Sequence, residues 1–140
     1  KEIGELNTFS QALNSEALEV YKGIDDFMVV LEDEAAIANN NPNFSLIKSM
    51  DSRGLIITAK GEEVDFVSRW YGPQTGINED PATGSAHALL ATYWSKILNK
   101  SELNARQLSK RVGHLKCEVK DDLVEITGQA KLYLKGNIQV

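Results

Sequence analysis

The sequence predicts an α+β domain in which a curved, mostly antiparallel sheet wraps around one central buried helix. Residues 85–98 have a helical pattern whose apolar positions cover much more than a narrow stripe, which is typical of an enclosed helix. The last third of the chain alternates apolar and polar residues with a period of two, as half-buried antiparallel strands do. A length of 140 residues suits one core. We therefore expect a single domain over residues 1–140.

The first half of the chain predicts one strand and two short helices around it. Residues 1–15 are polar and are expected to form an inter-domain linker. Residues 26–31 are apolar and predict a buried strand. Asp33 is expected to cap a short helix that ends at Ala38. A second short helix is expected over residues 43–50, with three inward-facing side chains, Phe44, Leu46 and Ile47.

The remaining strands flank the long helix. Residues 54–59 and 64–70 are strand-like, and the turn at residues 60–63 predicts that they pair as a hairpin. Three further strands are expected, over residues 115–119, 124–126 and 130–134. The Asp121–Asp122 pair predicts the turn between the first two of these. The two short helices are then expected to lie outside the sheet.

Composition excludes several classes of function. The chain has 15 basic and 20 acidic residues, a net charge of −5, and no compensating Lys/Arg block, so nucleic acid and anionic membranes are poor partners. Its apolar runs span only a few residues, whereas about 18–20 are needed to cross a bilayer. One cysteine, Cys117, excludes an internal disulfide, and two histidines give no clustered zinc ligands. We expect no metal site and a reducing, cytoplasmic location.

The start of the long helix is the first candidate site. The N-terminus of a helix carries unpaired N–H groups and the positive end of the helix dipole, so the Thr83-Gly84-Ser85-Ala86 segment predicts a site for a carboxylate or a phosphate. Gly84 lets such an anion approach the backbone closely. The alternative is that Thr83 or Ser85 only caps the helix.

Two carboxylates precede this segment. Glu79 and Asp80 are adjacent in a loop, so their side chains are expected to point apart and at most one should face the site. The alternative is a pair of solvated loop carboxylates. Arg69 is able to pair with either one. Arg111, in a second loop with several donors, is expected to help hold the anion or else to be a surface arginine.

Two further reactive residues are expected to be structural. His87 lies in the first turn of a largely apolar helix, which favours a packed, hydrogen-bonded core histidine over a base. Cys117 alternates with apolar residues, which favours a small buried hydrophobic side chain over a nucleophile. No phosphate-binding Walker loop, dinucleotide fingerprint, GxSxG or HExxH motif occurs in the chain.

Residues 76–87, Gly-Ile-Asn-Glu-Asp-Pro-Ala-Thr-Gly-Ser-Ala-His, resemble the signature of the PhzF-like (phenazine-biosynthesis-type) isomerase family. Further matches cover nearly the whole chain: Gln107-x-Ser109-x-Arg111-x-Gly113, Gly128-Gln129-Ala130, and residues 26–36 and 53–59. Val112 is a departure, because the family often has a second glycine there. This difference concerns the conformation of that loop.

The resemblance implies a diaminopimelate-epimerase-like fold, in which two similar domains each wrap a sheet around a helix and the active site lies between them. This chain resembles only the C-terminal domain, and its first methionine is Met28, so we expect the C-terminal half of a two-domain enzyme. The family uses no cofactor and no metal. Carboxyl groups move a proton on a small carboxylated substrate, and the principal catalytic glutamate belongs to the N-terminal domain.

The resemblance also assigns roles to residues. Asp80 matches the position of one of the two catalytic cysteines in related epimerases, and Gly84 and Ser85 match residues that hold the anionic end of the substrate. The expected set is catalytic Asp80, substrate-binding Thr83, Gly84, Ser85 and Ala86, and supporting Arg69, Asn78, Glu79 and Arg111. We expect the whole protein to be an isomerase or epimerase and the 140-residue chain alone to be inactive. Its expected partners are a small carboxylate and the N-terminal domain, and a homodimer is left open. The alternative is a non-catalytic metabolite-binding or assembly domain.

Overall fold

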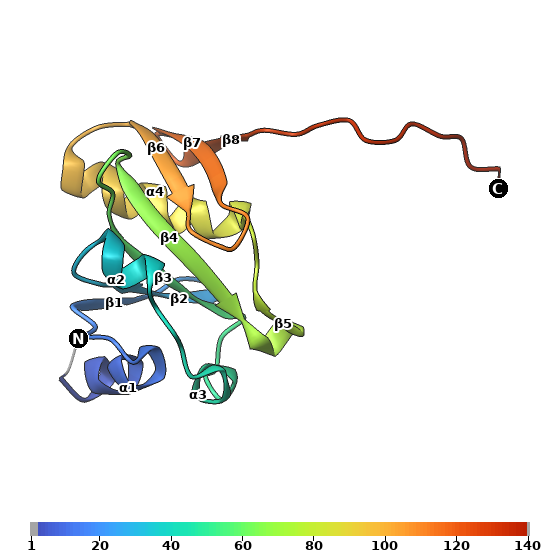
Figure 1. Ribbon diagram of the computed structural model, residues 1–140. Helices are drawn as coiled ribbons and strands as arrows, with labels where there is room; N and C mark the ends of the chain where they lie inside the picture. The colour runs from blue at the N-terminus through green and yellow to red at the C-terminus, as the bar shows by residue number, and fades with distance from the viewer. Residues whose placement is uncertain (1–2, 140) are drawn as a thin grey trace.

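The computed structural model describes residues 3–139, which fold into one mixed sheet with helices on both of its faces (Figure 1). The helices are α1 (Ile3–Leu13), α2 (Glu34–Ala38), α3 (Phe44–Lys48), the 3-10 turn η1 (Pro73–Thr75) and α4 (Gly84–Leu98). The strands are β1 (Glu19–Lys22), β2 (Asp26–Val30), β3 (Gly54–Lys60), β4 (Phe66–Gly72), β5 (Ile77–Glu79), β6 (Glu102–Gln107), β7 (Gly113–Lys120) and β8 (Leu123–Gly128).

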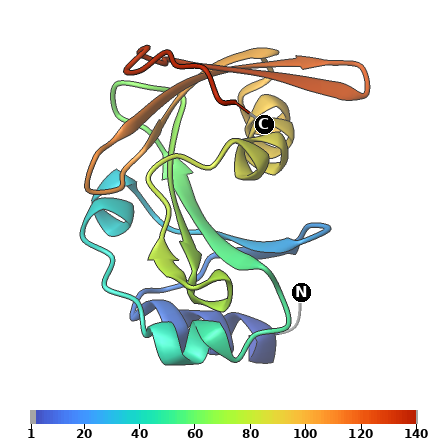
Figure 2. The ribbon, with the colours of Figure 1, turned by 90° about the vertical axis from the view of Figure 1, so that its right-hand side faces the viewer.

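The sheet is mostly antiparallel, as predicted. Its strand order is β1-β2-β3-β4-β6-β7-β8, and β5 pairs with β4. Two neighbouring pairs are parallel, β2 with β3 and β4 with β6. The β4–β6 pair is parallel because the chain crosses over between these strands through α4, which lies on one face of the sheet. Figure 2 shows the sheet curving around this helix.

Each central strand contributes to two separate hydrophobic clusters, because successive side chains point to opposite faces of a sheet. On β4, Val67 and Tyr71 pack in the cluster that includes residues of α1, α2 and α3. Phe66 and Trp70, on the other face, pack with Leu90 and Trp94 of α4. The sheet therefore separates an outer helical layer from the layer that holds α4.

Helix α4 is less enclosed than its sequence predicts. Its buried side chains, which face the sheet, are Ala86, His87, Leu90, Ala91 and Trp94. Trp94 is also fixed by a hydrogen bond, since its Nε1 donates to Thr58 Oγ1 at 2.9 Å. Ser85, Ala88, Lys96 and Ile97 are exposed on the opposite side. Within residues 3–139, the wide apolar surface of α4 is therefore only partly covered.

Several predictions from local sequence signals are confirmed. Asp33 caps α2, because its Oδ1 accepts a hydrogen bond from the backbone N–H of Ala36 at 2.7 Å. The strands β3 and β4 form the expected antiparallel hairpin. Within α3, Ile47 is buried as predicted, but Leu46 is 42% exposed, so the prediction that it faces inward is wrong. A five-residue helix makes only about one and a half turns, and Ile47 is its buried residue.

Two segments differ from the predictions in their secondary structure. Residues 3–13, read as part of a polar linker, form helix α1, in which Phe9, Ala12 and Leu13 are buried. Whether this segment also joins two domains stays a prediction. Residues 130–134, predicted as a strand, lie in an extended and exposed tail beyond β8. None of the helices within residues 3–139 has the length and apolar character that a membrane span requires.

Candidate active site

The elements that carry the predicted site residues meet at one edge of the sheet. The strands β4 and β6 are parallel, so both end at this edge. The strands β2 and β3 run the other way and begin there. The topology therefore brings four parts of the chain together: Asp26, Arg53, the segment 73–83 that follows β4 and contains η1 and β5, and the loop 108–112 after β6.

The first turn of α4 opens outward at this edge. Thr83 is the N-cap residue, with extended backbone angles, but its side chain makes no capping hydrogen bond to the helix. Gly84 and Ser85 are exposed, and a Cβ atom added to Gly84 would meet nothing within 4 Å. The first-turn N–H groups of a helix lack partners within the helix. The interpretation that Thr83 or Ser85 only caps α4 is therefore not supported by the geometry.

The hydroxyl of Thr83 is used to fix a carboxylate instead. Thr83 Oγ1 donates to Asp80 Oδ2 at 2.6 Å, and the backbone N–H of Asp80 donates to the carbonyl oxygen of Trp70 at 3.2 Å. Asp80 is half-buried. Its carboxylate is thus held three residues before an exposed helix start, which brings an acid–base group close to a set of backbone donors.

A glutamine from β6 holds this loop in place. The backbone N–H of Thr83 donates to Gln107 Oε1 at 2.8 Å. Gln107 Nε2 donates to the carbonyl oxygen of Asp80 at 2.7 Å and to Thr83 Oγ1 at 3.2 Å. Ser109 adds a further bond, from its Oγ to the carbonyl oxygen of Pro81, at 2.9 Å. Gln107 and Ser109 are therefore positioning residues for the loop that carries Asp80.

Val112 and Gly113 follow Ser109 in the loop after β6, and their surroundings explain why this loop favours glycine. A Cβ atom added to Gly113 would lie 2.9 Å from the Cβ atom of Ala82, closer than real Cβ contacts, so the two loops approach through Gly113. Val112 has a φ of 40°, in the left-handed region that a β-branched residue disfavours. The departure at Val112 thus falls where glycine fits the backbone better.

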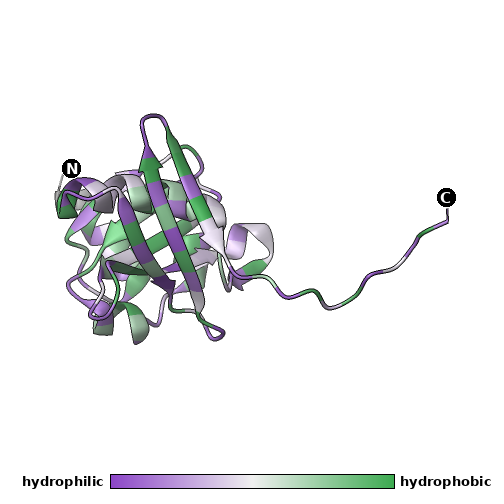
Figure 3. Ribbon diagram, turned by 90° about the horizontal axis from the view of Figure 1, so that it is seen from above, coloured by the Kyte–Doolittle hydropathy of each residue, from purple (hydrophilic) through white to green (hydrophobic). Residues whose placement is uncertain are grey.

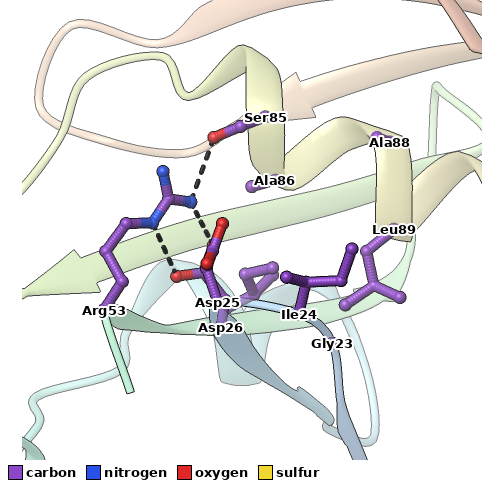
Figure 4. A pocket seen from close by; sticks show the side chains of 10 residues that line it. Gly23, Ile24, Asp25, Asp26, Arg53, Ser85, Ala86, Ala88 and Leu89 are labelled. Atoms are coloured by element: carbon purple, nitrogen blue, oxygen red, sulfur yellow. Dashed lines mark hydrogen bonds and ion pairs between the residues drawn. The ribbon is translucent and has the colours of Figure 1, made fainter.

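A partly buried ion pair between Arg53 and Asp26 lies beside the first turn of α4, as Figure 4 shows. Arg53 Nε donates to Asp26 Oδ1 at 3.1 Å, and Arg53 Nη2 bonds to both Asp26 Oδ2 and Ser85 Oγ, the latter at 3.0 Å. Asp26 is only 5% exposed. The hydrogen bonds that Arg53 donates to the Asp26 carboxylate raise the pKa of Arg53, so the guanidinium stays charged. These residues border a pocket of about 310 Å³ whose apolar lining includes Ile56 and Leu89.

Asp26 and Arg53 were not predicted as site residues. They are separated by 27 positions in the sequence and meet only because β2 and β3 pair in parallel, in a register that aligns Asp26 with Gly54. The available signal was weaker: Asp26 is a carboxylate at the start of an apolar strand, where burial requires a partner.

Glu79 and Asp80 point apart, as expected. Glu79 forms a two-point ion pair with Arg69, in which Nε donates to Oε1 at 2.7 Å and Nη2 donates to Oε2 at 3.0 Å. Arg69 Nη1 also donates to the carbonyl oxygen of Asn40 at 2.9 Å, and its guanidinium lies over the ring of Tyr71. The Arg69–Glu79 pair therefore lies on the side of the outer helical layer, away from α4.

The remaining predicted residues are less closely tied to the helix start. Asn78 and Arg111 are both exposed. His87 is buried, and its Nδ1 donates to the carbonyl oxygen of Thr83 at 2.8 Å, while burial lowers its pKa. Cys117 is buried, and burial raises the pKa of its thiol to about 11. The predictions that His87 and Cys117 are packed core residues are confirmed.

A curved sheet around a helix with an open start is the architecture of the diaminopimelate-epimerase-like class. Two solved structures share the fold: a phenazine biosynthesis protein of the PhzF family from Enterococcus faecalis (TM-score 0.80, 43% identity, 91% of this chain and 52% of that one), and a putative phenazine biosynthesis PhzC/PhzF protein from Clostridium difficile (TM-score 0.85, 37% identity, 100% and 52%).

The sequence comparison agrees with the fold. Residues 3–136 match the PhzC-PhzF family, described as phenazine biosynthesis-like protein. An uncharacterized isomerase of Pseudomonas aeruginosa is 45% identical over 130 residues, which cover 93% of this chain and 50% of that protein. The chain therefore belongs to the phenazine biosynthesis-like family, and the resemblance seen in the sequence is confirmed. It spans about half the length of these relatives.

Proposed function

We propose that this chain is the C-terminal domain of an isomerase or epimerase that moves a proton on a small carboxylated metabolite without a cofactor. Membership of a family with relatives named isomerases supports the reaction class. In the proposed reaction the backbone N–H groups of Gly84, Ser85 and Ala86 bind the carboxylate of the substrate. Asp80 then exchanges a proton with a carbon of the same substrate.

The observation that supports this proposal best is the position of the Asp80 carboxylate. Thr83 is the N-cap residue of α4 and at the same time binds Asp80 through its hydroxyl group, at 2.6 Å. A substrate carboxylate on the first-turn amides would therefore lie next to the Asp80 side chain. A positioned carboxyl group within reach of the reacting atom is what general acid–base catalysis requires.

The proposed reaction needs a second group on the other side of the substrate carbon. His87 is turned toward the sheet and buried against the ring of Phe66, and Glu79 is paired with Arg69. Asp26 is bound to Arg53. We therefore assign the opposing group to the N-terminal half of the longer protein, and we expect the 140-residue chain alone to fold and to show no turnover. A cytoplasmic location is part of the same proposal.

Asp80→Asn in the longer protein tests the assignment. The change keeps the size of the side chain and an acceptor for Thr83 Oγ1 but removes the group that carries the proton. We expect deuterium incorporation from D₂O into a panel of small carboxylates to fall by about 10²–10⁴-fold, with little change in melting temperature. Asp33→Asn, at the cap of α2 on the other side of the sheet, is the matched control and should retain full exchange. Retained exchange in Asp80→Asn together with lowered stability would show that Asp80 only supports the helix start.

A further inference from the structure

The side chain of Arg53 is fixed in place beside the first turn of α4. Arg53 comes directly before β3, at the sheet edge that carries the candidate active site, which we call the site edge. Its backbone N–H donates to the carbonyl oxygen of Asp25 at 2.7 Å. Its guanidinium bonds to both carboxylate oxygens of Asp26 and lies over the ring of Trp70, with 5.4 Å between Cζ and the ring centroid. Because Asp26 and Trp70 are buried, the groups that hold Arg53 are themselves part of the packed domain.

The same guanidinium directs a further donor at Ser85. Arg53 Nη2 lies 3.0 Å from Ser85 Oγ. A guanidinium carries donors and no acceptor, so the hydroxyl oxygen of Ser85 accepts this hydrogen bond. Figure 4 shows the Arg53 guanidinium between Asp26 and Ser85, bonded to both. Because the carboxylate of Asp26 balances the charge of Arg53, the pair contributes direction at the helix start and little net charge.

The proton of the Ser85 hydroxyl is left available for another partner. A serine in a helix often donates to the carbonyl oxygen four residues earlier, which here is that of Pro81. The Pro81 carbonyl accepts from Ser109 Oγ instead, at 2.9 Å. Within residues 3–139, the bond from Arg53 is the one hydrogen bond of the Ser85 side chain. With its oxygen occupied by Arg53 and its side chain exposed, Ser85 is able to donate its proton outward.

A donor at this position would join the donors of the backbone. The first-turn N–H groups of a helix lack partners within the helix, and a carboxylate accepts hydrogen bonds without donating any. We propose that Arg53 and Asp26 are positioning residues that orient the Ser85 hydroxyl as an additional donor to the carboxylate of the substrate. This inference rests on the proposed function, because it adds to the groups that bind the anionic end of that substrate.

The role of Arg53 in this arrangement is to remove a choice. A serine hydroxyl can rotate, and it can either donate or accept a hydrogen bond. When Arg53 occupies the oxygen, only donation is left. A carboxylate gains from such a donor, whereas the NH₂ group of a carboxamide needs an acceptor. The ion pair therefore favours an ionised carboxylate over the corresponding amide at the start of α4.

A double-mutant cycle in the longer protein tests whether Arg53 acts through Ser85. Sulfate is the probe, since its oxygens also only accept, and its dissociation constant is measured from the NMR signals of the Gly84 and Ala86 amides. Ser85→Ala should weaken sulfate binding by about 3–10-fold, as loss of a hydrogen bond to a charged group does. Arg53→Gln with Asp26→Asn, which leaves no buried charge unpaired, should also weaken it. Adding this pair of changes to Ser85→Ala should cause no further loss beyond about a factor of two.

A matched control neutralises another ion pair of the same kind. Arg106 Nη2 and Glu34 Oε1 are 2.8 Å apart, and both side chains are partly buried. Arg106→Gln with Glu34→Gln should leave the affinity for sulfate unchanged. Arg53→Lys is the second variant at the site, and it keeps a cation beside Asp26 without the planar fork that bonds two groups at once. It should lose the coupling to Ser85 while the melting temperature stays close to that of the unmodified protein.

Four outcomes would overturn the inference. Sulfate that does not shift the amide signals of the unmodified protein would remove the site on which Ser85 acts. Unchanged affinity in Ser85→Ala would show that the hydroxyl donates nothing. Unchanged affinity in Arg53→Gln with Asp26→Asn would leave the pair a structural role only. An equal loss from these two changes with and without Ser85→Ala would show that Arg53 acts by its charge. An intact cycle in a protein that exchanges no proton on any carboxylate would instead count only against the proposed reaction.

Discussion

Replacing Gln107 by alanine should destabilise the domain, because one side chain fixes the loop that carries Asp80. Gln107 is 1% exposed and makes three hydrogen bonds to Asp80 and Thr83. Its removal leaves the Thr83 N–H and the Asp80 carbonyl oxygen without these partners. A buried polar group left unpaired costs about 1–3 kcal/mol. Water can enter part of the loop, so we expect a loss of about 2–4 kcal/mol in the free energy of unfolding.

Urea unfolding of the 140-residue chain, followed by the fluorescence of the buried Trp70 and Trp94, measures this loss. The slope of the free energy of unfolding against urea concentration should be unchanged, because the surface exposed on unfolding stays nearly the same. Gln129→Ala, in the exposed tail, is the matched control and should stay within about 0.5 kcal/mol of the unmodified chain. If Gln107→Ala behaved like Gln129→Ala, the reasoning that Gln107 holds the loop would be refuted.

Three further predictions concern the helix start and its surroundings. A sulfate or phosphate ion should bind within hydrogen-bond distance of the Gly84–Ala86 amides. Crystals grown with either ion would show it. Amides that are closed off by an internal cap would contradict this prediction. Because burial lowers the pKa of His87, the unfolded chain binds more protons below its ordinary pKa of about 6.5, so stability should fall as the pH drops below that value. His87→Phe should reduce this slope by up to about 1.4 kcal/mol per pH unit, and an unchanged slope would contradict the prediction. Val112→Gly should raise the free energy of unfolding by about 0.5–1 kcal/mol, because relief of the left-handed backbone strain exceeds the extra entropy of glycine in the unfolded chain. Urea unfolding measures this gain. No gain would show that the strain is absent.

The parts of the fold that could be predicted from sequence rest on local signals. The cap at Asp33, the β3–β4 hairpin and the apolar pattern of α4 each depend on residues close together in the chain. Helix α1 was missed because its polar residues outweigh Phe9, Ala12 and Leu13, which gain their burial only by packing on other elements. The alternation of apolar and polar residues over 130–134, which Figure 3 shows along the tail, predicts a strand, but these residues lie in an exposed tail and pair with no strand within residues 3–139.

The same distinction applies to the site. Thr83, Gly84 and Asp80 lie in one continuous motif, and their proximity could be predicted from it. The contacts of Gln107 with Thr83 span 24 positions, and that of Arg53 with Asp26 spans 27. Such contacts depend on which strands are neighbours and in what register, and periodicity alone gives neither.

The loops at the two ends of β7 differ in whether a label or an insertion would disturb the candidate site. The strand β7 begins at the site edge and runs away from it, so the exposed turn at Asp121 and Asp122 lies at the far end of the molecule. A fluorescent label or an affinity peptide placed in this turn would be separated from Asp80 by the length of a strand. An insertion in the loop 108–112 would instead displace Ser109 and its bond to Pro81. The direction of β7 thus indicates where the protein can be modified for study without disturbing its proposed chemistry.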